Sequence, residues 1–369
     1  MKKGNLLAST ALVSAALAAG SAQALVLKLG GYAEFWAGWA DNESQAGVRN
    51  NLDVKHDAEI YFQAEEKLDN GLTVGFTAEL EAGPGNDLGS GPADNLNTST
   101  TESAHDTGWD EMFAYVKGNF GQFNIGNDDH ATGYVGGVRT VGPVGIFKSD
   151  AGDWLPGTYG LNNTDVDLGT GDAQNVTYFT PRIGGVQLIV SYAPDDGHGD
   201  WAEGAFDRQE TFGLHHIISG AARFSRKFGG VGVGLAAGYT MAESDTDVND
   251  THEGYTAAAD IQFGPARFTA AYAFEDLAGR REDDHWGASV IYAIDKMHSV
   301  SLAYAEGTSK RSVTREISDE VLTLGWEADM GKGVTFGASV FKAEAEDGLP
   351  TNAGDNDGWG VVGGVELRF

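Results

Sequence analysis

The last eleven residues of the chain, from Trp359 to Phe369, alternate between apolar and polar or small side chains and end on an aromatic residue. One face would carry Trp359, Val361, Val365, Leu367 and Phe369, and the opposite face Val362, Glu366 and Arg368. Since consecutive side chains of a strand point to opposite faces, this pattern predicts a β-strand and argues against a helix. A strand that is apolar on one face, polar on the other and aromatic at its end suits the closing seam of a membrane-spanning β-barrel.

The same two-residue alternation recurs along most of the chain after residue 25. Leu52, Val54 and Phe62, for example, would share one face of a strand whose other face carries Lys55 and Glu59. The predicted strands are joined by short links at 68–71, 118–120, 181–185, 227–229, 264–265, 295–296 and 331–332. They alternate with longer, acidic links at 41–51, 83–108, 128–172, 194–207, 242–252, 275–283, 306–316 and 343–357. Eight long and seven short links predict sixteen strands in an all-β, up-and-down antiparallel transmembrane barrel, with both termini on the short-link side.

The first residues predict export. Lys2 and Lys3 precede an apolar run from Leu6 to Ala19, and Ala22-Gln23-Ala24 has the small-x-small pattern of a signal-peptidase site. The Ala-rich run is shorter than the roughly 20 residues of a membrane-spanning helix, so we expect 1–24 to be a cleaved signal peptide and 25–369 to be the barrel.

Composition narrows the functional classes. The formal net charge is −30, which argues against nucleic-acid binding, and no cysteine is present. Mean hydropathy is −0.26, as expected when half of each strand faces water. We expect no enzyme activity, because His215 and His216, as neighbours, would point to opposite faces of one strand and no nucleophile motif accompanies them. Aromatic side chains near strand ends predict interfacial girdles: Trp39, Trp109, Tyr239, Tyr255, Tyr272, Trp286 and Trp359.

Several motifs, in this order and with this rhythm of links, resemble the Gram-negative general porins over residues 25–369. They are the opening strand Leu29-Gly30-Gly31-Tyr32, the hairpin 113–121 with its continuation 123–126, and the terminal Phe369. The resemblance implies a sixteen-stranded, usually trimeric outer-membrane barrel that contacts lipid and lipopolysaccharide. Small hydrophilic solutes and ions would diffuse passively through its water-filled lumen, and the assembly machinery would recognise Phe369.

The link 128–172 is the longest, and in general porins this third long loop folds inward to narrow the pore. Irregular backbone at membrane depth is tolerated where it lines a cavity. Its candidate constriction residues are Asp128, Asp129, Arg139, Lys148, Asp150 and Asp153. A loop that lies over the mouth with solvated charges is the alternative.

The facing wall departs from the family pattern. Glu34, Glu59 and Asp110 stand where Arg or Lys is common, and Lys28 and Lys55 are the basic residues expected to face the lumen there. An acidic wall opposite an acidic loop would lower the energy of a cation in the narrow passage, so we predict cation preference. The alternative is that these carboxylates lie away from the constriction and are screened by salt.

No cofactor is expected, although acidic links could bind Ca²⁺. Asp245, Asp247 and Asp250 begin like a calcium loop, but Gly is missing at its sixth position and Glu at its twelfth, where Thr256 stands. Two other functions remain open: a solute-specific porin, for which Tyr32 and Trp36 would supply aromatic contacts, and a non-conducting surface barrel that acts as an adhesin.

Overall fold

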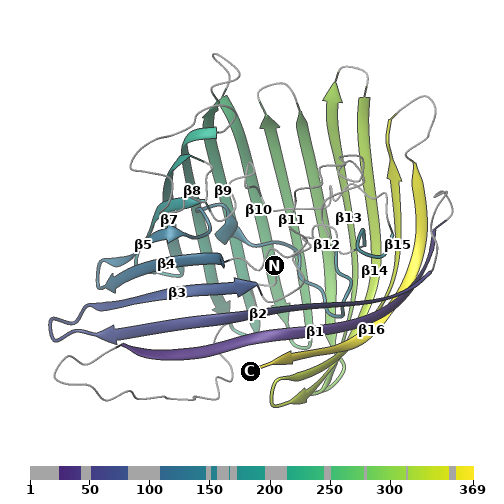
Figure 1. Cartoon of the computed structure of the whole chain (residues 1–369), viewed down its shortest axis with the longest axis horizontal. Helices are drawn as coiled ribbons and strands as arrows, with labels where there is room; N and C mark the ends of the chain where they lie inside the picture. The colour runs from purple at the N-terminus through teal and green to yellow at the C-terminus, as the bar shows by residue number, and fades with distance from the viewer. Residues whose placement is uncertain are drawn as a thin grey trace, which may run out of the picture.

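Sixteen strands form one closed antiparallel barrel in the computed structural model of the protein (Figure 1). It describes residues 25–42, 51–81, 109–146, 151–155, 166, 173–195, 214–244, 251–277, 281–312, 315–348 and 355–369. The strands are β1 (Val26–Asn42), β2 (Leu52–Lys67), β3 (Thr73–Glu81), β4 (Trp109–Gly118), β5 (Gly121–Asn127), β6 (Gln174–Phe179), β7 (Val186–Asp195), β8 (Leu214–Phe228), β9 (Val231–Ser244), β10 (Thr251–Phe263), β11 (Ala266–Leu277), β12 (Glu282–Ala293), β13 (His298–Ser312), β14 (Arg315–Gly331), β15 (Val334–Glu346) and β16 (Asn356–Arg368). Each strand pairs with its neighbours in sequence, and β1 pairs with β16. The predicted fold class and strand number are confirmed.

One short 3₁₀ helix, η2 (Gly133–Val135), interrupts the described part of the long link between β5 and β6. Among the described residues, no helix is long and apolar enough to cross a membrane.

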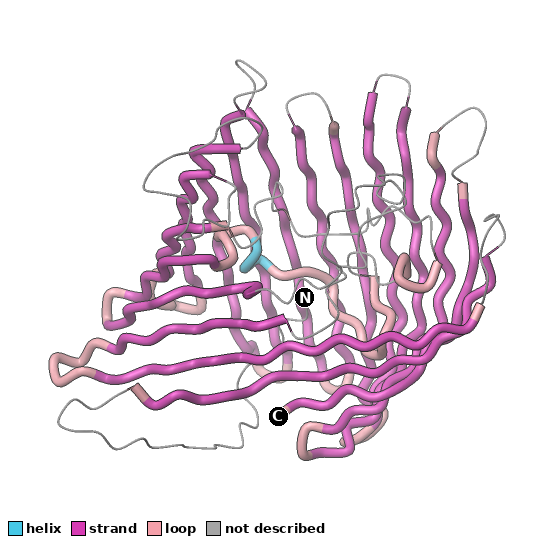
Figure 2. Tube along the Cα trace, in the orientation of Figure 1, coloured by secondary structure: helices cyan, strands magenta, loops and turns pink. Residues whose placement is uncertain are grey.

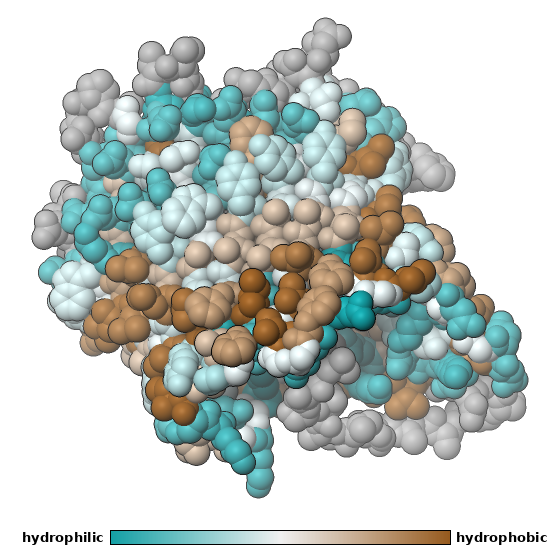
Figure 3. Space-filling model, turned by 180° about the vertical axis from the view of Figure 1, so that it is seen from behind, coloured by the Kyte–Doolittle hydropathy of each residue, from teal (hydrophilic) through white to brown (hydrophobic). Residues whose placement is uncertain are grey.

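The outer face of the barrel is apolar. On β14, Leu322 and Leu324 are 46% and 54% exposed, whereas Val321 and Thr323 beside them are 2% and 0% exposed. The space-filling view shows a hydrophobic band between more hydrophilic regions above and below it (Figure 3). Exposed leucines that alternate with buried or polar residues are the arrangement of a lipid-facing barrel wall, so the predicted alternation is confirmed.

Aromatic residues border this band on both sides. Near the long links, Trp39 packs edge-on against Trp359 with ring centroids 5.0 Å apart, and Trp286 lies 5.4 Å from Tyr304. Near the short turns the exposed aromatic side chains include Phe120, Phe228, Phe263, Tyr292 and Phe336. Rings at both ends of the strands match the predicted interfacial girdles.

Several strands extend further than the sequence predicted. The expected link 306–316 is mostly strand, because β13 continues to Ser312 and β14 begins at Arg315. Lys310 Nζ lies 2.7 Å from Glu282 Oε2 on β12, and Glu316 is its partner in register on β14. Alternating charges across strands therefore extend the sheet beyond the aromatic residues, where an acidic composition alone indicated a loop.

The terminal residue completes the seam between β1 and β16. The backbone N–H of Gly31 donates to the carbonyl oxygen of Phe369 at 3.0 Å, and the Phe369 N–H donates to the Gly31 carbonyl at 3.1 Å. A Cβ at Gly31 would lie 2.3 Å from the backbone oxygen of Glu59, so a larger residue does not fit there. Phe369 itself is 56% exposed, and its role as an assembly signal stays a prediction.

The predicted signal peptide, 1–24, and the Ca²⁺ candidates Asp245, Asp247 and Asp250 lie outside the described residues.

Candidate functional site

The described part of the link between β5 and β6, residues 128–146, 151–155 and 166, is called the third link below. It contacts the inner wall of the barrel, on the face opposite the exposed leucines, and Figure 2 shows it inside the ring of strands. Its backbone N–H groups donate to Ser and Thr side chains of four strands: Ala131 to Ser219 (3.1 Å), Arg139 to Thr269 (2.9 Å), Val141 to Ser301 (3.1 Å) and Val144 to Ser339 (3.1 Å). These bonds satisfy irregular backbone that would otherwise be costly at membrane depth.

Apolar packing holds the same segment. Val144, Ile146 and Leu155 are at most 2% exposed and form one cluster with inner-wall residues that include Trp36 and Phe341. The wall is lined with small residues where the link approaches most closely. A Cβ at Gly325 would lie 1.8 Å from the Val141 carbonyl oxygen. The core of the protein thus lies between the third link and the strands.

Asp128 anchors the start of the third link and does not line the open lumen. Asp128 is only 1% exposed. Its two carboxylate oxygens accept hydrogen bonds from Tyr134 Oη and Asn124 Nδ2, both at 2.6 Å. Burial raises the pKa of Tyr134 well above its usual range, so the hydroxyl stays protonated and can donate. The predicted pore-lining role of Asp128 is therefore replaced by a structural one.

The other loop candidates lie in different places. Asp129 and Asp153 are half-buried, and Arg139 is exposed. Lys148 and Asp150 lie outside the described residues. Trp154, beside Asp153, lies under the Lys55 ammonium group, which is 5.4 Å from the ring centroid. The link therefore reaches the wall residue Lys55 on β2.

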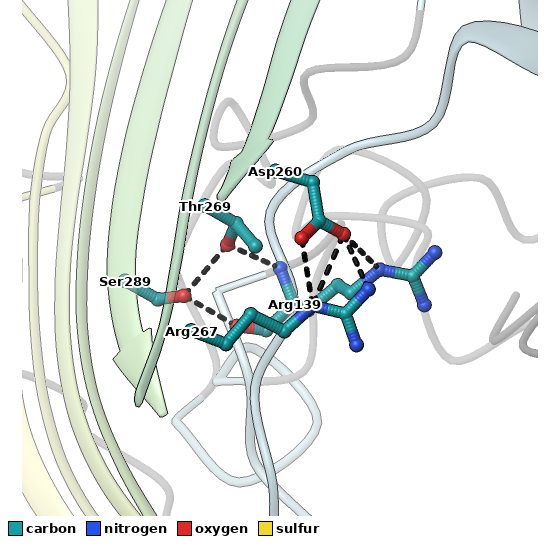
Figure 4. Close-up of polar contacts among 5 residues, drawn as sticks. All are labelled: Arg139, Asp260, Arg267, Thr269 and Ser289. Carbon is teal, nitrogen blue, oxygen red and sulfur yellow. Dashed lines mark hydrogen bonds and ion pairs between the residues drawn. The ribbon is translucent and has the colours of Figure 1, made fainter. Parts of the chain in front are cut away.

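Arg139 belongs to a charged group that the sequence did not predict. Its Nε lies 3.3 Å from Asp260 Oδ2 on β10, and Asp260 also forms an ion pair with Arg267 on β11 (Figure 4). The Arg139 carbonyl accepts from Ser289 Oγ at 2.6 Å, which fixes the backbone of the arginine. Two guanidinium groups thus share one carboxylate at the inner wall. Arg267 has the parity of a lumen-facing residue, which is the signal in the sequence that could have found it.

Glu59 and Asp110 lie close together on the inner wall, and a third carboxylate, that of Glu81, joins them. Carboxylate oxygens of Glu59, Asp110 and Glu81 all lie within 4.8 Å of one another. Glu59 and Glu81 are register partners on β2 and β3, and Asp110 reaches them because the pairing of β3 and β4 shifts beside it. Glu59 also accepts from Tyr61 Oη at 2.8 Å.

Glu34 lies on the same inner face, one strand away from this group. Its register partners are Asp57 on β2 and Glu366 on β16, so three acidic residues lie side by side. Trp36 Nε1 donates to Glu34 Oε2 at 2.8 Å. Trp36 is 9% exposed and packs beneath the third link, so it offers no surface to a passing sugar.

Both expected lysines face the lumen, with two more that sequence reasoning missed. Lys55 lies 3.0 Å from Asp53, and Lys28 is the register partner of Gln63. Lys67 and Lys117 share this inner face, and Lys117 Nζ lies 2.8 Å from Glu65 Oε2. Carboxylates still outnumber the four lysines on the inner faces of β1 to β4: Glu34, Asp53, Asp57, Glu59, Glu65, Glu79, Glu81, Asp110 and Glu111.

Further basic residues line the opposite wall. Arg223 on β8 and Arg182, in the turn before β7, both donate to Gln187 Oε1, at 2.8 and 3.4 Å. The lumen therefore has an acidic side on β1 to β4 and a basic side formed by Arg223 on β8, Arg267 on β11 and Arg139 of the third link.

A closed β-barrel with a lipid-facing outer surface and a charged lumen partly filled by its own link is a membrane-spanning channel. The sequence matches the family model for Gram-negative porins over residues 8–366. The chain belongs to the Gram-negative porin family, whose members form channels in the outer membrane. No curated protein sequence matches it significantly.

Solved structures share the fold at low sequence identity. An anion-selective porin from Comamonas acidovorans is 15% identical with a TM-score of 0.59, and the match covers 94% of this chain and 100% of that one. OmpT of Vibrio cholerae in its trimer form is 11% identical with a TM-score of 0.60, covering 93% and 99%. A mutant of Rh. blastica porin is 16% identical with a TM-score of 0.56, covering 93% and 100%.

Proposed function

We propose that this porin is an open channel for passive diffusion of small hydrophilic solutes and ions, and that it prefers cations. The observation that carries the proposal is the acidic inner face of β1 to β4, where oxygens of Glu59, Glu81 and Asp110 lie within 4.8 Å of one another. In a narrow, water-poor passage these charges lower the energy of a cation and raise that of an anion. The proposed channel performs no catalysis.

Several basic residues of the lumen, on both of its sides, are neutralised by ion pairs, which supports the same sign. Arg139 and Arg267 share Asp260, and Lys117 pairs with Glu65. A structural neighbour is an anion-selective porin, so the fold alone does not determine which ions pass.

The test is the reversal potential of purified protein in a planar bilayer under a salt gradient. We expect stepwise conductance with a cation-selective sign. Glu59→Gln combined with Asp110→Asn should lower the cation-to-anion permeability ratio by at least about fivefold, since even one of the two charges removed, about 4 Å from an ion, contributes about 1 kcal/mol in water.

Two further variants complete the measurement. Asp260→Asn should also shift the ratio toward anions, because it leaves Arg139 and Arg267 without the carboxylate they share. Glu66→Gln, on the outer face of β2, is the control and should leave the ratio unchanged. An anion-selective native channel would overturn the cation preference, and folded protein without conductance would overturn the open channel.

We also propose that residues 1–24 are removed on export and that three chains associate in the outer membrane, in contact with lipid and lipopolysaccharide. The trimer form of a structural neighbour supports the association. Native mass spectrometry of protein extracted from membranes should give three copies of a chain that begins at Leu25. A chain that retains Met1, or a monomer in every mild detergent, would contradict the corresponding part.

A further inference from the structure

Three potential metal ligands meet at the ends of β8 and β9 that lead into the long links. Donor atoms of His215, His216 and Glu243 all lie within 4.8 Å of one another. His215 Nε2 is 3.5 Å from Glu243 Oε2. Two ligands of one tetrahedral Zn²⁺ ion, with bonds of about 2.0–2.2 Å, are separated by about 3.3–3.6 Å. His215 and Glu243 therefore already have the spacing of two ligands on one ion.

A β-bulge creates this convergence and corrects the expectation that the two histidines point apart. The register of β8 and β9 shifts between His215 and Ile218, and His216 has a φ of 51°. A left-handed backbone is uncommon at a residue with a Cβ and persists only where the surrounding structure holds it. The irregular backbone brings the two imidazole rings to a centroid distance of 5.2 Å.

A neighbouring residue on β7 orients one of the rings. Tyr192 Oη lies 3.0 Å from His216 Nδ1, and the two rings stack with an interplanar angle of 25°. With Nδ1 engaged by the hydroxyl, Nε2 of His216 is the nitrogen available to a metal ion. Metal-binding histidines commonly have their second nitrogen hydrogen-bonded in this way.

We propose that His215, His216 and Glu243 bind one Zn²⁺ ion at the outer rim of the barrel. Two imidazole nitrogens and one carboxylate oxygen form a donor set that suits Zn²⁺, and water completes the tetrahedron. Hard cations such as Ca²⁺ prefer oxygen ligands and are excluded by this set. The ion joins the start of β8 to the end of β9 at the rim.

The test is equilibrium dialysis of the folded, detergent-solubilised chain against Zn²⁺ in an excess of Ca²⁺, which competes for sites made of carboxylates alone. We expect one tightly bound Zn²⁺ per chain by elemental analysis. His216→Gly removes the ligand and tolerates the left-handed backbone, and Glu243→Gln keeps the shape of the side chain. Each should weaken binding by at least about tenfold, since loss of even an outer-shell partner costs about 10–100-fold.

Matched controls separate a built site from general attraction to an acidic protein. His56, on the outer face of β2, is an exposed histidine whose ring stacks on Phe35 of β1. The variant His56→Gln should leave Zn²⁺ binding unchanged. Co²⁺ should give the visible absorption of a tetrahedral complex in the native chain and lose it in both site variants. Equal Zn²⁺ affinity in the native chain and the two site variants would overturn the proposal, whatever the conductance of the channel.

Discussion

Leu302→Arg is expected to lower the free energy of unfolding by about 2–4 kcal/mol, the cost of an arginine near the bilayer midplane. Leu302 is on the outer face of β13, 55% exposed, and its partners in register are Val290 and Leu324. It lies between Val300, whose β12 partner is the aromatic Tyr292, and Tyr304. The measurement is urea unfolding of the refolded barrel in liposomes.

Leu52→Arg is the matched control for depth. Leu52 is 58% exposed, nearly the same as Leu302, but it begins β2 opposite Trp39 and so lies at the interface. There the same substitution should cost about 0–1 kcal/mol. Equal losses for the two variants would show that the band between the aromatic residues is not the lipid-facing region.

Gly325→Ala is expected to displace the third link and to increase the single-channel conductance. The added Cβ would lie 1.8 Å from the Val141 carbonyl oxygen and 2.9 Å from Ser301 Oγ, which is the acceptor for the Val141 N–H. Overpacking of this kind also costs about 1–3 kcal/mol of stability. Planar-bilayer recording gives the conductance, and denaturant unfolding gives the stability.

Gly232→Ala provides the comparison for this experiment. Gly232 is also on the inner face, on β9, but a Cβ there would make ordinary contacts with Gln262, 3.6 Å from its Cβ and 4.0 Å from its carbonyl oxygen. Its conductance should match that of the native channel. If Gly325→Ala also left the conductance unchanged, the third link would not limit the passage.

Period-two patterning is what made the wall predictable. It placed Glu34 and Glu59 on the inner face, because the face of a strand residue depends only on its parity while the strand stays regular. The seven short turns followed from Gly-rich and polar breaks, and the structure places them between the expected strands. Asp128 is buried because the link folds back and brings Tyr134 to its carboxylate, beside Asn124 of β5. The pattern of the sequence does not show this fold of the link, so the burial of Asp128 was not predicted.

Irregular backbone and contacts distant in sequence account for the rest. Parity failed at His215 and His216, since a bulge with a left-handed residue leaves no periodic signal. The ion pair of Asp260 with Arg139 joins a link to a strand more than a hundred residues later, and no local pattern encodes such a meeting. The outer ends of β13 and β14 are held in the sheet by charge pairs between the strands. Their charged composition alone predicted a loop.

The hydrogen bonds of the third link also set an order of events during assembly. Val141 and Val144 bond to Ser301 on β13 and Ser339 on β15, strands that the chain supplies only near its end. Thr323 on β14 adds a bond to the Val144 carbonyl at 2.8 Å. Until these strands are in place, this part of the third link lacks these hydrogen-bond partners on the wall. The third link therefore takes its final position against the wall only after β13, β14 and β15 have joined the barrel.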